Sequence, residues 1–217
     1  MARKNRNTAS ERDHGPGLPT LPQISVEAAG LLHERAVAVR EQALGPDHPA
    51  VAADVAALAA LLDAPGQHTE AEALYRRALA SFTRLYGPDH YEIAVNSNNL
   101  AALLQARGQY TEAEPLYQHA LTIKEHLLGP QHPDVAMTLS NLAVLYASLG
   151  RHADAEALYQ RALALFEQAF DPTHPHVRTC LRNYARLLRD TQRRAEARTL
   201  EARARQAPPP RRGHDEG

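Results

Sequence analysis

Apolar residues in this chain recur at helical spacing, in segments that come in pairs. One segment runs from Tyr91 to Ala106, and after Gly108 a second runs from Thr111 to Leu127. Residues three and four positions apart lie on one face of a helix, so each segment has an apolar side. The pattern predicts two helices joined by a short turn, which together form a helical hairpin. The apolar positions of the first segment include Ile93, Val95, Leu100, Leu103 and Leu104.

The hairpin pattern repeats every 42 residues. A Gly-Pro-Asp-His-Pro segment marks each interval, complete at residues 45–49 and in variant form from Gly87, Gly129 and Asp171. A period of this length is typical of one supersecondary unit that is copied and stacked, and such arrays offer a long surface to a partner. Alanine and leucine outnumber β-branched and aromatic residues, so we expect helices and no strands.

We therefore expect an all-α solenoid built from one lone helix and four hairpins. The lone helix is expected at residues 21–44, because Ala29 and Ala36 share the register of Ala71 and Ala78 in the next hairpin. Both ends of the chain are polar and rich in glycine or proline, without a period, so we expect disordered tails at residues 1–20 and 207–217. The hairpins are expected at residues 45–86, 87–128, 129–170 and 171–206.

Glycine and proline punctuate the predicted helices. A glycine follows the first helix of three hairpins, where a left-handed residue ends a helix without steric cost. A proline suits the first turn of the helix that follows the linker, because its missing N–H is not needed there. The glycines are Gly66, Gly108 and Gly150, and the prolines are Pro49, Pro133 and Pro175.

Four histidines recur at the same place in the linkers: His48, His90, His132 and His174. Packed helices lie ~8–10 Å apart, whereas zinc holds its nitrogen ligands at ~2.0–2.1 Å, so the four cannot share one ion. We expect these side chains to cap helix starts, and we expect no metal site.

The formal net charge of -1 conceals an uneven distribution. Residues 45–170 carry 14 acidic and 7 basic residues, whereas residues 171–217 carry 6 acidic residues and 11 arginines. Near-neutrality overall argues against a nucleic-acid partner. No apolar run approaches the roughly 18 residues of a membrane span, and none follows the basic N-terminus, so neither membrane insertion nor secretion is expected.

The single cysteine, Cys180, excludes an intrachain disulfide and favours a reduced, cytoplasmic protein. Its equivalents in the earlier hairpins are Asp54, Asn96 and Thr138, so we expect a partly exposed thiol. The motifs of phosphate loops, serine hydrolases, zinc proteases and C-x-x-C redox sites are all absent. We expect no enzymatic activity and no cofactor.

The second hairpin resembles the tetratricopeptide repeat. The family's core pattern G-x-Y-x-x-A-x-x-x-Y-x-x-A-L is present from Gly108 to Leu121. With the 42-residue period, the linker and the Asn-Leu-Ala of the first helix, the chain is similar to the kinesin-light-chain type over residues 24–206. The resemblance implies a right-handed superhelical solenoid that acts as a protein- or peptide-binding scaffold or adaptor.

The resemblance also implies a binding site. In tetratricopeptide arrays the first helix of each hairpin lines a concave groove, and an asparagine there often binds the backbone of an extended peptide. Asn99, Asn141 and Asn183 hold that position here, and Ala57 holds it in the first hairpin. A primary amide offers a donor and an acceptor, which suits a peptide bond. The equally open alternative is that these amides bridge neighbouring helices of the array.

Four arginines in the first helix of the last hairpin are further candidates: Arg178, Arg182, Arg186 and Arg189. They fall within about 80° of one another on a helix, and the family's register implies that they face the groove. Guanidinium groups suit carboxylates, so the predicted partner is an acidic peptide or a chain terminus. The alternative is that the arginines only solubilise an exposed last hairpin.

The last hairpin also departs most from the repeat. Gln192 replaces the turn glycine and Glu201 replaces the packing tyrosine. A polar final helix is expected of a terminal cap. The lysine-containing carboxylate clamp of chaperone-binding tetratricopeptide domains is not expected, since Lys4 and Lys124 are the only lysines.

Two other functions stay open. The face of the lone helix can pair with a second copy of the chain, with contacts from Leu31, Leu32, Val37 and Val39. Alternatively, since related arrays are often part of a larger signalling ATPase, the resemblance also allows a sensor module that works with a separate ATPase. The chain itself lacks the phosphate loop that such an ATPase requires.

Overall fold

The computed structural model describes residues 26–63 and 66–205. Within these residues the chain forms nine helices and no strand. The predicted tails at residues 1–20 and 207–217 lie outside the described residues, as do residues 21–25. The helices are α1 (Val26–Leu44), α2 (Pro49–Asp63), α3 (His68–Tyr86), α4 (Tyr91–Ala106), α5 (Tyr110–Leu128), α6 (Pro133–Ser148), α7 (His152–Ala169), α8 (Pro175–Asp190) and α9 (Arg194–Arg205).

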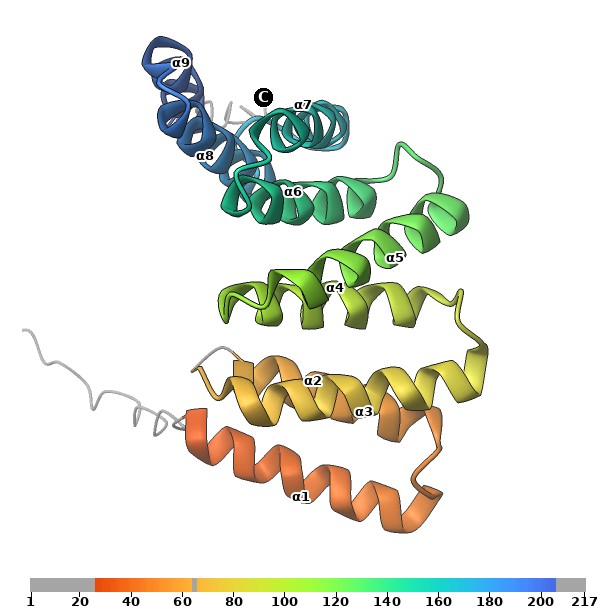
Figure 1. Cartoon of the computed structure of the whole chain (residues 1–217). Helices are drawn as coiled ribbons and strands as arrows, with labels where there is room; N and C mark the ends of the chain where they lie inside the picture. The colour runs from red at the N-terminus through yellow and green to blue at the C-terminus, as the bar shows by residue number, and fades with distance from the viewer. Residues whose placement is uncertain (1–25, 64–65, 206–217) are drawn as a thin grey trace, which may run out of the picture.

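The helices form one lone helix and four hairpins, and the predicted all-α solenoid is confirmed. The most extensive packing joins α2 to α3, α4 to α5, α6 to α7 and α8 to α9, while α1 packs on α2. Figure 1 shows the hairpins stacked in chain order, from α1 at one end to α8 and α9 at the other. None of the described helices is both long enough and apolar enough to cross a membrane.

The first helices of the hairpins form the tighter side of the stack. Helix α2 contacts α4, α4 contacts α6, and α6 contacts α8. The second helices α3, α5 and α7 each pack on the first helix that follows, but in the described part of the chain their backbones do not contact one another. Since the stack is closer on the side of the first helices, that side is the concave, inner side of the array.

Small residues that recur in every second helix let the two helices of each hairpin approach closely. Ala113 and Ala155 are fully buried, and the neighbouring Tyr117 and Tyr159 are at most 1% exposed. Burial raises the pKa of the equivalent Tyr75 to about 12. Burying an aromatic side chain of this kind stabilises the fold by ~1.5–3 kcal/mol, so these positions supply much of the hairpin core.

The linker histidines cap the next helix, as predicted. The Nδ1 atom of His132 accepts a hydrogen bond from the backbone N–H of Asp134 at 3.1 Å. The same bond forms two residues after His48, His90 and His174. It satisfies one of the backbone donors that a helix start leaves unpaired, which explains why the histidine repeats with the linker.

The turn inside each hairpin needs a left-handed residue. Gly150 takes a φ of 74°, as its place after α6 predicts. Gln192 occupies the same place after α8 and takes a φ of 65°, the only positive φ of a non-glycine residue in the described part of the chain. The fourth turn therefore keeps the geometry of the others without the residue that suits it.

The expectation of a partly exposed Cys180 is wrong. Its side chain is 1% exposed, and burial raises the pKa of the thiol to about 12. The equivalent Asn96 and Thr138 are buried too, because each donates a hydrogen bond to a carbonyl one turn earlier in its own helix. Asn96 and Thr138 are thus satisfied within their own helix, whereas the partly exposed Asp54 pairs with Arg40 of α1 at 2.6 Å.

Lys124 is a buried cation in the core between the second and third hairpins. It is 2% exposed and holds the place that Phe82 and Phe166 take in the flanking hairpins. Its Nζ donates to Thr138 Oγ1 at 3.1 Å and to the carbonyl of Asp134 at 3.4 Å. Burial lowers the pKa of Lys124.

The lone helix α1 exposes apolar side chains. Leu31, Leu32 and Val39 are 62%, 57% and 66% exposed. The prediction that Val37 belongs to the same exposed face is wrong, because its side chain is 5% exposed and lies in the core. Val37 differs from the three exposed residues because α1 turns one side toward α2 and the other away from it.

Candidate functional site

The inner face of the array is made of three rows of side chains, with one member of each row in every first helix. Within each first helix the members of the three rows stand at positions i, i+4 and i+7, so they lie on the same side of that helix. All twelve residues are half-buried or exposed. The first row is Ala53, Val95, Met137 and Thr179; the second is Ala57, Asn99, Asn141 and Asn183; the third is Ala60, Ala102, Val144 and Arg186. We call these twelve residues the inner face.

The composition of the inner face changes along the array. The first hairpin contributes only alanine, and the two middle hairpins add larger apolar side chains around an amide. The fourth hairpin contributes Thr179, Asn183 and Arg186, the only charged residue among the twelve. Of the four arginines predicted to face the groove, the inner face thus contains one.

The three predicted asparagines all lie on the inner face and are half-buried. Asn141 Nδ2 donates to Asn98 Oδ1 at 3.3 Å, which links α6 to α4. Asn141 and Asn183 also line a hollow of about 190 Å³ together with Met137 and Thr179. Asn141 therefore bridges two helices, as the structural alternative requires, while it also faces an open hollow.

The amides of Asn99 and Asn183 make no side-chain hydrogen bond with any residue that the structure describes. A half-buried amide with unused donors and acceptors suits a backbone ligand better than one committed to the scaffold. Of the three predicted asparagines, these two are the stronger candidates for binding.

The four predicted arginines do not lie together. Arg186 is in the third row of the inner face, but Arg178, Arg182 and Arg189 line a hollow of about 320 Å³ between α8 and α9. At about 100° per residue, Arg178, Arg182 and Arg189 point in directions within about 40° of one another around the helix axis. Arg186 points about 40° further round, toward the inner face. The expectation that all four face the groove is therefore wrong for three of them.

The equivalent positions in earlier hairpins explain this placement. Ala136, equivalent to Arg178, is fully buried, and Ser140, equivalent to Arg182, is 8% exposed. Ser140 lines the hollow that α8 closes, and Asn98, at the same place in α4, accepts the bond from α6. This side of a first helix is where the next hairpin packs. In the fourth hairpin no described helix packs on this side.

Most of these arginines already have partners at the end of the array. Arg178 Nε donates to the carbonyl of Ala204 at 2.8 Å, at the last turn of α9. Arg189 pairs with Glu201 at 2.7 Å, and Arg205 pairs with the same carboxylate at 3.2 Å. Arg182 donates only to Thr179 Oγ1, at 3.1 Å, among the described residues.

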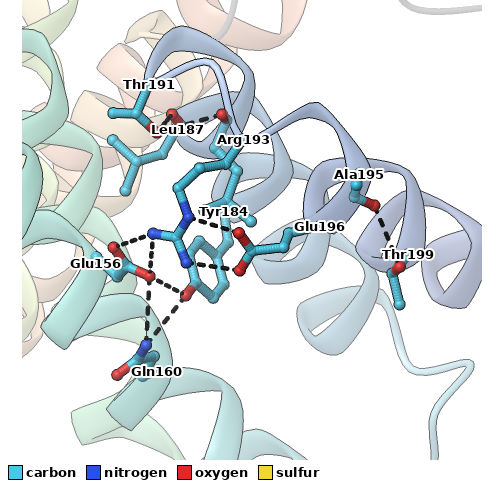
Figure 2. A network of polar contacts seen from close by, with 10 residues as sticks. Glu156, Gln160, Tyr184, Leu187, Thr191, Arg193, Ala195, Glu196 and Thr199 are labelled. Atoms are coloured by element: carbon cyan, nitrogen blue, oxygen red, sulfur yellow. Dashed lines mark hydrogen bonds and ion pairs between the residues drawn. The ribbon is translucent and has the colours of Figure 1, made fainter.

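Ion pairs join successive hairpins on the outer side. Arg193 donates to both carboxylate oxygens of Glu156 in α7, at 2.7 and 2.6 Å, and also pairs with Glu196 at 2.6 Å (Figure 2). Tyr184 donates to Glu156 at 2.8 Å and accepts from Gln160 at 3.2 Å. Arg193 holds the pKa of Glu156 below its ordinary value.

An equivalent set of ion pairs joins the second hairpin to the third. Arg151 pairs with Glu114 in α5 and with Asp154, both at 2.8 Å, and its guanidinium lies 3.7 Å from the centre of the Tyr146 ring.

Across the described residues, no group of three or more histidine, cysteine, aspartate or glutamate side chains could hold a metal ion.

Comparison with known proteins identifies the repeat. The tetratricopeptide repeat family model matches four overlapping segments. No curated protein sequence matches significantly. The matched segments are residues 27–84, 52–125, 91–168 and 134–208.

Solved structures agree with this family. A kinesin-light-chain-type protein of nearly identical TPR-like repeats from Podosopora anserina is 27% identical, with a TM-score of 0.68 over 83% of this chain and 85% of that one. BtubC (BKLC) from P. vanneervenii is 26% identical, with a TM-score of 0.71 over 86% and 78%. The apo form of RapI, at 19% identity and a TM-score of 0.70 over 83% and 63%, shares the fold.

Proposed function

Because the chain belongs to the tetratricopeptide repeat family, we propose that it is a non-catalytic protein-binding scaffold or adaptor whose inner face holds an extended peptide. Arrays of this family generally serve protein–protein interaction. The peptide would lie across the first helices α4, α6 and α8, where the rows of the inner face carry amides between apolar side chains.

The observation that carries this proposal is the amide row at Asn99, Asn141 and Asn183. An extended peptide has a free N–H and C=O at every residue, which must find partners when the peptide leaves water. Half-buried primary amides offer both a donor and an acceptor. Val95 and Met137, one turn before the amides, supply apolar contacts for the peptide's side chains.

The proposed preference for an acidic peptide rests on Arg186 alone within the inner face. Arg186 is exposed and lies one turn from Asn183. A carboxylate at the end of the peptide that lies over α8 would accept a charge-assisted hydrogen bond there. The proposal therefore places one acidic residue, or a chain terminus, at this end of the peptide.

The test uses peptides selected by display of a random library on the full chain. Binding should fall about tenfold or more with Asn183→Ala and with Arg186→Glu, because each removes a polar contact to a desolvated ligand. Arg182→Glu is the matched control, since it makes the same charge change one turn away, outside the inner face. Selected peptides that bind all three variants like the wild type would show that the inner face is not the site.

Self-association is a second candidate, favoured by the exposed Leu31, Leu32 and Val39 of α1. Exposed apolar residues that cluster on one helix face are typical of contact surfaces. A second copy would cover this face. Analytical ultracentrifugation tests this directly: a monomer across micromolar concentrations, unchanged by Leu31→Glu, would remove the candidate.

A further inference from the structure

The end of the array carries a strongly charged surface formed by α8 and α9. Two adjoining hollows, of about 320 and 440 Å³, lie on it. Their charged lining is six arginines and one glutamate, Glu201. We call this surface the end face; its arginines are Arg178, Arg182, Arg189, Arg194, Arg198 and Arg205.

The end face has the shape of a helix-binding site. Inside the array, each following first helix packs against both helices of the hairpin before it: α6 on α4 and α5, and α8 on α6 and α7. The buried Ala136 and Ser140 mark this contact on α6. Their equivalents on α8 are Arg178 and Arg182, so the end face offers the same two-helix cradle with guanidinium groups where the others have small side chains.

The charge of the end face is reversed relative to the internal junctions. At each internal junction a glutamate of the earlier hairpin receives an arginine from the segment that leads into the next hairpin's second helix: Glu72 pairs with Arg107, Glu114 with Arg151 and Glu156 with Arg193. The equivalent residue of the fourth hairpin is Arg198. A partner that docks in the same way must therefore supply a carboxylate at this point.

A purely solubilising end would not need charges of one sign. Surfaces that serve solubility mix both signs, whereas this one has six cations and a single carboxylate that two of them already share. The reversal also argues against continued stacking of the array on a second copy, because a repeat of the internal pattern would place an arginine against Arg198, and like charges repel.

We propose that the end face of α8 and α9 binds an acidic helix of a partner protein, seated where the next first helix of the array would lie. The carboxylates of the partner helix, spaced at three and four residues, face the guanidinium groups of Arg178, Arg182 and Arg198. This surface is separate from the inner face, so the chain would hold two partners or two segments of one partner.

The experiment uses two synthetic helical peptides of about 20 residues, long enough to be helical in water. One carries glutamates at i, i+4, i+7 and i+11, and the other carries glutamine at those positions. Fluorescence anisotropy with the full chain should give a Kd for the glutamate peptide at least about tenfold lower than for the glutamine peptide, since charge-assisted bonds are the stronger ones.

Two variants separate this surface from the inner face. Arg182→Glu should raise the Kd of the glutamate peptide about tenfold or more, and circular dichroism should show an unchanged fold, because the Arg182 side chain is exposed and bonded only to Thr179 in the described chain. Arg186→Glu should leave the Kd within about twofold. Equal loss in both variants would reduce the effect to general attraction and overturn the proposal.

Two further arms identify other occupants. A single-stranded oligonucleotide of equal charge that displaces the glutamate peptide and binds more tightly would assign the surface to phosphates and overturn the proposal. The chain's own Asp215 and Glu216 follow α9 in the sequence. If the glutamate peptide binds only to the full chain carrying Asp215→Asn and Glu216→Gln, the occupant is this segment and not a partner protein.

Discussion

The third and fourth hairpins share a backbone pattern but differ in what covers them. In the third, Tyr159 is fully buried and Leu163 is 7% exposed. In the fourth, the equivalent residues are Glu201, which is 21% exposed, and Arg205, which is 77% exposed. The first helices, α6 and α8, differ in the same way at the equivalent residues Ala136 and Arg178. One set of positions is thus core when a hairpin follows and charged surface when the array ends.

This difference shows that, in a stacked array, a position's chemistry depends on its neighbour. The first helices of the two hairpins have the same length, and both hairpins have a capping histidine at the linker and a left-handed turn. What changes is whether a following hairpin buries the side of the first helix that faces along the array. Since burial of an unpaired charge is costly, arginine can occupy these positions only at the end.

The largest expected effect comes from giving the third hairpin a residue of the fourth. Ala136→Arg places a guanidinium at a site with no exposure, on the side of α6 where α8 packs. We expect a loss of about 4 kcal/mol in the free energy of unfolding, from an unpaired buried charge and overpacking. Urea denaturation followed by circular dichroism measures it, and hydrogen exchange should show the fourth hairpin opening first.

The matched control is Arg178→Ala, which gives the fourth hairpin the residue of the third. It removes one hydrogen bond, to the Ala204 carbonyl, so the expected loss is about 1 kcal/mol. Equal losses in the two variants would mean that α8 does not shield the side of α6 that the structure buries.

Much of this fold follows from local signals in the sequence. Helix ends, capping histidines and left-handed turns were predictable because each depends on a few adjacent residues. The inner asparagines were located by family register. The arginines were misplaced because the groove side and the stacking side of one helix are neighbouring arcs, which a single helical stripe does not separate.

A signal for the correct placement was nevertheless present in the repeat. The equivalents of Arg178 are Ala94 and Ala136, and small residues repeated at one position indicate close packing with a neighbour. The burial of Cys180 was harder to predict from the sequence, because the polar residues Asn96 and Thr138 at the equivalent positions suggested exposure. In the structure each of them donates a hydrogen bond to the backbone of its own helix. The half-buried Val95 and Met137 of the inner face were missed because apolar residues at helical spacing were taken as the packed side of each helix.

A second, smaller effect concerns the turn that both hairpins share. Gly150→Gln should cost about 1 kcal/mol, because a side chain in the left-handed region is strained; no other atom lies within 4 Å of the added Cβ, so no clash contributes. Gln192→Gly should stabilise the fourth hairpin, by less than about 1 kcal/mol, since glycine also gains entropy in the unfolded chain. Thermal denaturation of the two variants measures both. A destabilised Gln192→Gly protein would show that the glutamine side chain contributes contacts that outweigh its backbone strain.

The smallest expected effect is the pH dependence of the ion pair between Glu156 of the third hairpin and Arg193 of the fourth. The Arg193 guanidinium lowers the folded pKa of Glu156, so the unfolded chain binds this proton at a higher pH than the folded one does. The stabilisation from the pair is therefore complete above the unfolded carboxyl pKa, about 4.3, and is lost as the pH falls through the lower folded pKa. Both side chains are partly exposed, so salt should weaken the pair.

A double-mutant cycle isolates this contribution from the other titrating groups. Wild type, Glu156→Gln, Arg193→Gln and the double variant would be unfolded thermally at pH 7 and at pH 3. The coupling between the two positions should be favourable at pH 7 and smaller at pH 3, where protonation has begun to remove the carboxylate. A coupling of the same size at both pH values would mean that the side chains interact through packing or neutral hydrogen bonds, and that charge does not hold the third hairpin to the fourth.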